Sequence, residues 1–194
     1  VTVNPVPTIG NKAAVICSGA TFTVTPANGV TEIVPSGTTY TWSTPVIAPS
    51  GSITGGSARS TGQTSISQTL TNTTNASATA TYTVTPQSGT CTGPTFTVTV
   101  TVNPVPSIGN KTAVICSGTA FSVTPANGGS EIVPSGTTYT WSAPVIFPAG
   151  SITGGSAQST GQTSISQTLT NTTNASSTAT YTVTPQSGLC TGMT

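Results

Sequence analysis

Very few side chains in this sequence could carry acid–base chemistry. The chain of 194 residues contains three Lys or Arg, two Asp or Glu and no His. A general acid–base pair needs two titratable groups placed together. Besides tyrosines and cysteines, the ionisable side chains are Lys12, Glu32, Arg59, Lys111 and Glu131. The sequence therefore predicts a protein that is not an enzyme.

One acid and one base do occur in both halves of the chain. Lys12 and Glu32 recur as Lys111 and Glu131, whereas Arg59 has Gln158 as its counterpart. Two interpretations of the Lys–Glu pair are open. It forms a weak surface salt bridge, or Lys12 joins a neighbouring asparagine in an isopeptide bond that Glu32 assists. The salt bridge is the preferred interpretation, and an intact mass lower by one ammonia per domain would contradict it.

The four cysteines do not have the spacing of a metal site. A zinc site uses Cys or His ligands at short spacing, and a hard cation wants several carboxylate oxygens. Cys17, Cys91, Cys116 and Cys190 stand singly, and carboxylates are almost absent. We expect neither a metal nor any other cofactor.

The charge balance excludes two further classes of partner. The net charge is +1, and no run of basic residues interrupts the sequence. Phosphate backbones and anionic lipids are recognised by clustered Lys and Arg. No apolar run approaches the ~20 residues of a membrane-spanning helix. We therefore expect no nucleic-acid binding and no direct membrane insertion.

The chain consists of two copies of one sequence. A constant offset of 99 superimposes Cys17 on Cys116 and Trp42 on Trp141, and 14 of 95 aligned positions differ, which leaves 81 identical. A period near 100 residues suits an independently folding sandwich domain. We predict the end of a preceding strand and a Pro linker at 1–7, repeat 1 at 8–102, a Pro linker at 103–106 and repeat 2 at 107–194.

The two copies do not end at the same point. Copy 1 closes with a Thr- and Val-rich segment at 95–102, whereas copy 2 stops where that segment would begin. Val1-Thr2-Val3 repeats Val100-Thr101-Val102. We therefore expect repeat 2 to lack its last strand, and we expect the sequence to be an excerpt of a longer array.

Alternating apolar and polar residues predict short strands with one buried face. In copy 1 such segments lie at 13–16, 21–25, 39–43, 65–70, 78–84 and 95–102, with a weaker one at 52–54, and Gly- and Asn-containing turns separate them. No amphipathic helix can be written. The predicted fold is all-β, a tandem pair of immunoglobulin-like β-sandwiches. The predicted core aromatics are Phe22, Tyr40, Trp42, Tyr82, Phe121, Tyr139, Trp141 and Tyr181.

The cysteines have a structural use in such a fold. Four cysteines allow three pairings, and the offset of 99 favours Cys17 with Cys91 and Cys116 with Cys190, one bridge in each repeat. This pairing requires an even number of strands between the two cysteines. Disulfides persist in oxidising compartments, so we expect an extracellular location.

Three segments of copy 1 resemble the PKD-like repeats of Bacteroidetes surface proteins. They are Ile16-Cys17-Ser18-Gly19, the segment 35–43 that contains Tyr40-Thr41-Trp42-Ser43, and the segment 80–86 that precedes Cys91. The resemblance covers both copies and implies stalks of long secreted adhesins, including gliding-motility adhesins exported by the type IX secretion system. Ordinary PKD domains carry Trp-Asp-Phe-Gly-Asp-Gly where this chain has Tyr40–Ser43, so roles of those aspartates do not transfer.

The function predicted from these features is structural. The repeats would form the stalk of a long filament at the cell surface and present an adhesive element away from the cell. Their partners would be neighbouring repeats of the same chain, with other stalks or surface glycans beside them. Two alternatives remain: a glycan- or protein-binding module that uses the loop Ser50–Gly62, and a filament subunit that polymerises by strand exchange.

Overall fold

The computed structural model describes residues 1–193, which form strands, turns and loops. The predicted all-β fold is confirmed. The chain divides into two compact units, Val1–Pro104 and Val105–Thr194, which we call repeat 1 and repeat 2. In residues 1–193 we find no helix with the length and apolar character needed to cross a membrane.

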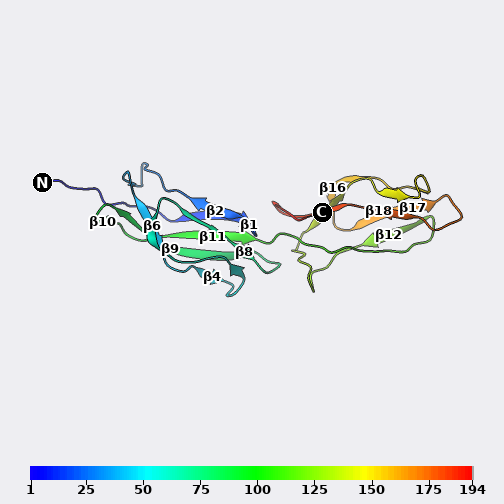
Figure 1. Ribbon diagram of the computed structural model, residues 1–194, viewed down its shortest axis with the longest axis horizontal. Helices are drawn as coiled ribbons and strands as arrows, with labels where there is room; N and C mark the ends of the chain where they lie inside the picture. The colour runs from blue at the N-terminus through cyan, green and yellow to red at the C-terminus, as the bar shows by residue number, and fades with distance from the viewer. Residues whose placement is uncertain (194) are drawn as a thin grey trace. The chain divides into compact units, whose positions relative to one another are not determined.

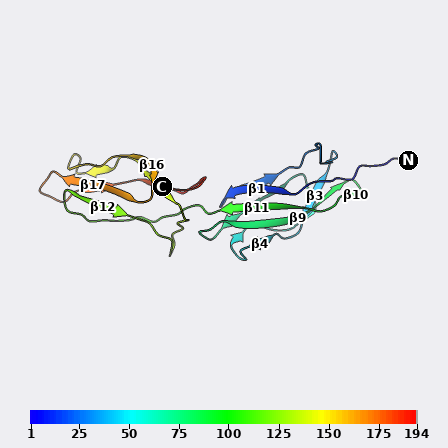
Figure 2. The ribbon, with the colours of Figure 1, turned by 180° about the vertical axis from the view of Figure 1, so that it is seen from behind.

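The larger sheet of repeat 1 is built around two long central strands. Its order is β1 (Lys12–Cys17), β11 (Phe96–Asn103), β9 (Ala78–Ser88), β3 (Thr39–Trp42) and β6 (Arg59–Gln63). Two short strands, β4 (Val46–Ala48) and β10 (Cys91–Thr92), also pair with β9. Figures 1 and 2 show β11 between β1 and β9 from both sides.

The period of two in the sequence explains the burial along the central strands. Val98, Val100 and Val102 of β11 are completely buried, as are Ala80 and Tyr82 of β9. Apolar residues at alternate positions of a strand share one face, and that face turns to the core. The intervening threonines of β11 are half-buried, because a strand on either side covers part of each.

A second layer closes the core of repeat 1. It contains the pair β2 (Thr21–Val24) and β7 (Ile66–Thr69) and the pair β5 (Ile53–Thr54) and β8 (Thr71–Asn72). The ring of Phe22 on β2 lies 5.4 Å from the ring of Tyr82 on β9. The Tyr82 hydroxyl donates a 2.9 Å hydrogen bond to Gln68 Oε1 on β7. These contacts join the two layers of the sandwich.

The first and last strands of repeat 1 are direct neighbours. β1 pairs with β11 in parallel, from Lys12 opposite Val98 to Cys17 opposite Asn103. The remaining pairs of the repeat are antiparallel. The sequence pattern predicted both strands but not this pairing, because hydrophobic alternation identifies a strand's buried face and not its neighbour.

Repeat 2 reproduces this plan with fewer strands. They are β12 (Thr119–Val123), β13 (Thr138–Trp141), β14 (Val145–Phe147), β15 (Ile152–Thr153), β16 (Gln158–Gln162), β17 (Ile165–Asn171), β18 (Thr178–Thr180), β19 (Val183–Ser187) and β20 (Cys190–Thr191). Residues 111–116, the counterpart of β1, are not in a strand. The sequence contains no counterpart of β11 to pair with them.

The missing neighbour strand leaves repeat 2 with a smaller core. Tyr139, Trp141 and Ile165 form its buried cluster, whereas fifteen residues form that of repeat 1. Tyr181 is half-buried, although its counterpart Tyr82 is completely buried. A strand stabilises a sandwich largely through the apolar side chains that it buries. The core of repeat 2 is smaller because no strand occupies the position that β11 has in repeat 1.

Several short strands lie outside the sequence prediction. The weak strand predicted at 52–54 is not among them, because the structure forms β5 there. The proposed contact loop Ser50–Gly62 contains β5 and most of β6. The strands β4, β8 and β10 were also missed, since two or three residues are too few to show a period.

Candidate functional site

The pair β1–β11 is the candidate site for bearing load. Within repeat 1 the strand that follows the incoming segment lies beside the strand that leads out of the repeat. Because the two strands are parallel, the incoming end of β1 and the outgoing end of β11 lie at opposite ends of the ladder. Tension applied at the two chain ends therefore acts along the strands and loads all their hydrogen bonds together, in shear.

The incoming segment is fastened just before β1. Thr8 and Ile33 exchange backbone hydrogen bonds of 2.8 and 2.9 Å. Glu32 Oε1 accepts a 2.9 Å hydrogen bond from the backbone N–H of Gly10 and a 2.6 Å hydrogen bond from Lys12 Nζ. The preferred Lys–Glu salt bridge is thus formed in the structure. It ties the start of β1 to the loop that precedes β3.

The electrostatics of this pair follow from its hydrogen bonds. The pKa of Glu32 is lowered, mainly by the hydrogen bond from Lys12 and then by that from the Gly10 N–H. Repeat 2 has the same arrangement: Glu131 lies 2.8 Å from Lys111 and accepts a 2.7 Å hydrogen bond from the Gly109 N–H. The pKa of Glu131 is lowered in the same way. The Glu32 and Glu131 carboxylates are therefore ionised at neutral pH.

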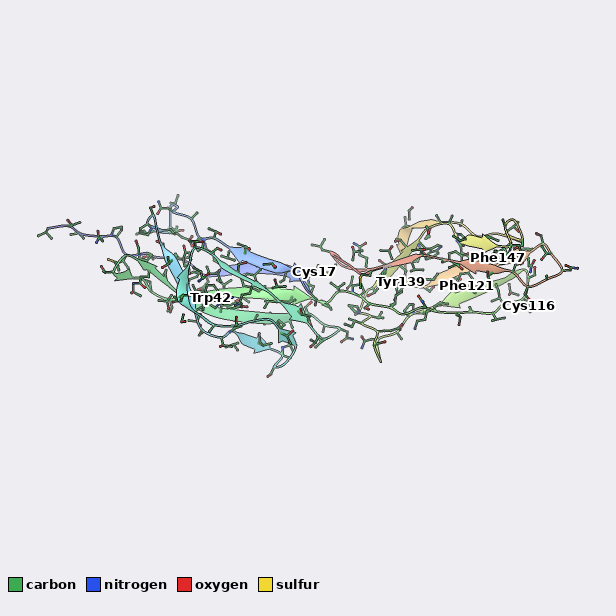
Figure 3. All side chains as sticks on the ribbon, in the orientation of Figure 1. Cys17, Trp42, Cys116, Phe121, Tyr139 and Phe147 are labelled. Atoms are coloured by element: carbon green, nitrogen blue, oxygen red, sulfur yellow. The ribbon has the colours of Figure 1, made fainter. Side chains whose placement is uncertain are left out.

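The cysteines do not pair within each repeat, which corrects the sequence prediction. Cys91 and Cys116 are free thiols, whereas Cys17 and Cys190 are disulfide-bonded. Cys17 is the last residue of β1. Figure 3 labels Cys17 at this end of the strand.

Strand register explains why the predicted bridge cannot form. Cys17 lies level with Asn103, beyond the pairing of Val102 with Ala78 at the start of β9. Cys91 pairs with Ser88 at the other end of β9. The two cysteines are therefore separated by the length of β9, roughly 30 Å at ~3.3 Å per residue. A disulfide needs Cα atoms about 4.4 to 6.8 Å apart.

We name the two ends of a repeat from this arrangement. The proximal end carries β10 with Cys91, and there Gly93 packs on Pro7 so closely that a Cβ at Gly93 would collide with the Pro7 carbonyl. The distal end carries Cys17 and Asn103. In Figure 1, β10 lies at the end from which the N-terminal segment extends, and the β1 arrowhead points to the opposite end.

Repeat 2 has the same polarity. Cys190 pairs with Ser187 at the end of β19, and the neighbouring Gly192 packs on the carbonyl of Pro106. Cys116 lies at the distal end, where the adjacent Ser117 hydroxyl donates a 3.2 Å hydrogen bond to the Asn171 carbonyl. Each repeat thus holds one cysteine at each of its ends.

The predicted core aromatics fall into two groups. Phe121 and Tyr181 of repeat 2 are half-buried, and their rings lie 5.4 Å apart. The other predicted aromatics are buried: Phe22, Tyr40, Trp42, Tyr82, Tyr139 and Trp141. The Trp42 indole N–H donates a 3.0 Å hydrogen bond to the Ser57 carbonyl, so its polar atom is also engaged internally.

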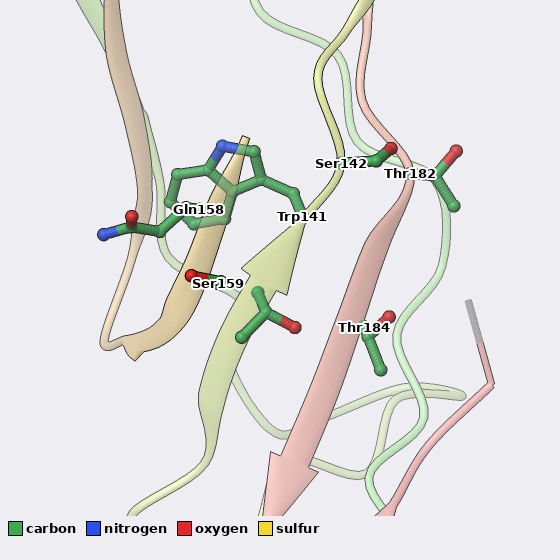
Figure 4. A pocket seen from close by; sticks show the side chains of 7 residues that line it. Trp141, Ser142, Gln158, Ser159, Thr182 and Thr184 are labelled. Atoms are coloured by element: carbon green, nitrogen blue, oxygen red, sulfur yellow. The ribbon is translucent and has the colours of Figure 1, made fainter. Parts of the chain in front are cut away.

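A surface pocket of about 390 Å³ lies over the sheet of repeat 2 (Figure 4). It is lined by uncharged side chains: Thr140, Trp141, Ser142, Gln158, Ser159, Thr182 and Thr184. Trp141 is only 6 % exposed, and its indole N–H donates to the Ser156 carbonyl at 3.2 Å. Hydroxyl groups without an ionisable partner offer no acid–base chemistry. An indole face this buried offers little stacking surface to a sugar.

Metal-ligating side chains are also dispersed in the part of the chain that the structure describes. Among residues 1–193, no three His, Cys, Asp or Glu side chains come close enough to hold a metal ion. The candidate functional features are therefore the parallel pair β1–β11, the hydrogen bonds that hold the segment before β1, and the cysteines at the two ends of each repeat.

The comparisons with known proteins agree with the fold. A protein-family model described as "PKD-like domain" matches this chain twice, over residues 14–106 and 113–194. A search of curated protein sequences finds no match. A PKD-like sandwich is typically a non-catalytic module, and together with a disulfide it is consistent with an extracellular structural or adhesion repeat. The two matches together span most of the chain, which therefore belongs to the PKD-like domain family as two tandem copies.

Proposed function

We propose that these repeats are tension-bearing units in the stalk of a long extracellular filament at the cell surface, which holds an adhesive element away from the cell. The observation that carries the proposal is the parallel pairing of β1 with β11 over six residue pairs. A repeat pulled at its chain ends must shear this ladder before the sandwich opens. In an unzipping geometry the same bonds would break one after another at lower force.

Two other features support a stalk. The Glu32 carboxylate holds Gly10 and Lys12, so tension from the incoming segment is delivered at the start of β1. The segment Asn103-Pro104-Val105-Pro106 contains alternating prolines, which favour an extended and stiff backbone. In such a stalk, partners would be neighbouring repeats, other stalks or surface glycans. The family resemblance further suggests an adhesin exported for gliding motility.

The test compares matched proline substitutions in the two repeats. Ala14→Pro places a proline in β1, where it restricts the backbone and interrupts the ladder with β11. Ala113→Pro makes the same change at the equivalent position of repeat 2, which is not in a strand. Each variant is stretched between tethers on its two chain ends in an optical trap.

We expect Ala14→Pro to lower the unfolding force of repeat 1 markedly and its free energy of unfolding by about 2 to 3 kcal/mol. Ala113→Pro should leave the unfolding forces of repeat 1 and repeat 2 near those of the unsubstituted chain. If Ala14→Pro lowered the equilibrium stability but left the unfolding force unchanged, the β1–β11 ladder would not be the element that bears tension.

A further inference from the structure

The outer face of the larger sheet of repeat 1 carries two ranks of small side chains that cross four strands. Figure 2 shows these strands in the order β4, β9, β11 and β1. Strand register places Val46, Thr81, Thr99 and Ala13 in one rank, and Ala48, Thr79, Thr101 and Val15 in the other. We call these eight residues the outer array.

The outer array is neutral and open to solvent. Each of its side chains carries a methyl group, the four threonines also carry a hydroxyl, and none is charged. The residues on the two marginal strands are exposed, Val15 by 65 % and Val46 by 72 %. The threonines between them are half-buried. A ligand for this face therefore has to be uncharged and has to suit both methyl and hydroxyl groups.

The hydroxyls of the outer array are largely unused by the rest of the protein. Thr79 Oγ1 donates a long hydrogen bond of 3.5 Å to the Ala48 carbonyl. Within residues 1–193, the hydroxyls of Thr81, Thr99 and Thr101 have no hydrogen-bond partner, and none of them is a buried unpaired group. A threonine hydroxyl can donate one hydrogen bond and accept two. These three groups are therefore available to ordered water.

The outer face of the second layer is different, although it is also rich in threonine. There the Thr21 and Thr69 hydroxyls lie 2.6 Å apart and bond to each other across β2 and β7. Thr23 and Ser67 form a second such pair at 3.0 Å. Cross-strand hydroxyl pairs of this kind leave fewer groups for a ligand, so the second layer supplies a matched control surface.

We propose that the outer array is an ice-binding face, whose ligand is the surface of solid water. Neighbouring strands lie about 4.8 Å apart, and residues two apart along a strand lie about 6.7 Å apart. The paired ranks of threonines thus set their hydroxyls on a rectangular grid with these two repeats. Oxygen atoms on a prism plane of ice form a rectangular grid with similar repeats. The proposal goes beyond the stalk function and does not depend on it.

The side-chain chemistry of the array suits such a ligand. Methyl groups restrict the orientation of water in their first hydration layer, and the hydroxyls between them can fix that layer by hydrogen bonds. A charged side chain would instead keep a hydration shell that does not match a neutral water lattice. All eight positions avoid charge.

Sheet twist limits a flat array, but two ranks are short enough to tolerate it. Neighbouring strands rotate by about 20 to 25° relative to each other. Each rank lies only about 3.4 Å from the line midway between the ranks. The twist between β9 and β11 therefore lifts their four threonines from a common plane by less than about 1 Å. These threonines form the flattest part of the array.

Repeat 2 supplies a natural substitution that breaks this surface. Phe147 stands where repeat 1 has Ala48, and its side chain is 72 % exposed. It lies opposite Thr178, as Ala48 lies opposite Thr79. A ring at this position extends beyond the small side chains beside it. Ala48→Phe should therefore leave repeat 1 folded but remove its binding to ice.

The experiment measures the fraction of the full chain that enters a slowly growing shell of ice, together with thermal hysteresis of single ice crystals. We expect the unsubstituted chain to be enriched in the ice and to shape the crystals. The double variant T81K/T99K places two charges in the middle of the array and should be excluded from ice. T21K/T23K adds the same two charges on the second layer and should bind like the unsubstituted chain.

Circular dichroism and urea unfolding establish that each variant is folded before its ice binding is compared. An unsubstituted chain that is excluded from ice would overturn the proposal. It would also be overturned if T81K/T99K and Ala48→Phe entered ice as well as the unsubstituted chain does. Sedimentation velocity in the cold gives a third check. A dimer that T81K/T99K dissociates would show that the array contacts a second copy of the chain, and would overturn ice as its ligand.

Discussion

At the residue scale, the buried tyrosine of repeat 1 joins its two layers. Tyr82 packs against Phe22 and donates its hydroxyl to Gln68 across the core. Burial raises the pKa of Tyr82 to about 12. Gln68 Oε1 also accepts a 2.9 Å hydrogen bond from the Ser57 N–H, so its oxygen keeps one donor if the tyrosine hydroxyl is removed.

This environment predicts how stability depends on pH. Because the folded state holds the Tyr82 proton more tightly than the unfolded chain does, stability should fall as pH rises above the ordinary tyrosine pKa of about 10 and should level off near 12. Tyr82→Phe should cost about 1 kcal/mol at neutral pH, the net value of one hydrogen bond. It should also weaken the alkaline loss of stability.

Urea unfolding at a series of pH values checks this, with the free thiols alkylated beforehand. Tyr181→Phe is the matched control in repeat 2, where the hydroxyl donates to Gln167 at 2.7 Å but the ring is only half-buried. It should leave the alkaline unfolding of repeat 1 unchanged. A Tyr82→Phe variant with the alkaline profile of the unsubstituted chain would contradict the assignment.

At the element scale, a single strand accounts for the main difference between the repeats. In repeat 1, β11 is paired on both sides and buries three valines completely. It also accepts hydrogen bonds from the second layer, since Asn72 Nδ2 donates to the Val102 carbonyl at 2.8 Å. The same amide also donates a 2.7 Å hydrogen bond to the Ala76 carbonyl, and this second bond alone has an equivalent in repeat 2, from Asn171 Nδ2 to the Ala175 carbonyl.

Repeat 2 should therefore be completed by supplying this strand. We expect a chain lengthened after Thr194 by the sequence of Phe96–Asn103 to form the missing β11 and to order 111–116 as a strand. Each valine that is fully buried contributes about 1.5 to 3 kcal/mol, so the gain in stability should reach several kcal/mol. Hydrogen exchange should show new protection at 111–116. An extension with its three valines replaced by Asp is the control and should give no protection.

At the scale of the whole molecule, two nearly identical sequences have unequal cores. The buried core cluster of repeat 1 contains fifteen residues, whereas that in the described part of repeat 2 contains three, with partly buried neighbours. Stability scales with the apolar surface that folding removes from water. Each repeat contains one tryptophan, Trp42 or Trp141, and both are buried.

Unfolding of the chain should accordingly not be two-state. We expect repeat 2 to unfold at a lower urea concentration than repeat 1. Trp42→Phe leaves Trp141 as the reporter of repeat 2, and Trp141→Phe leaves Trp42 as the reporter of repeat 1. Coincident transitions for the two reporters would mean that the repeats unfold as one unit.

The amino-acid pattern alone was enough to predict the fold class, the duplication and the inward faces of the long strands. Alternation in 78–84 and 95–102 predicts which side chains are buried, because side-chain direction along a strand depends only on local geometry. The scarcity of charged groups, apparent from composition, also restricted the possible chemistry. Short strands such as β8 and β10 have too few residues to show a pattern.

Which strands are neighbours, and therefore which cysteines can pair, became known only from the three-dimensional fold. The parallel pairing of β1 with β11 sets Cys17 and Cys91 at opposite ends of repeat 1 and makes the predicted bridge impossible. A spacing of 99 residues identifies equivalent cysteines but not their distance in space. The order and direction of strands depend on contacts between segments far apart in the chain, and local patterns do not encode them.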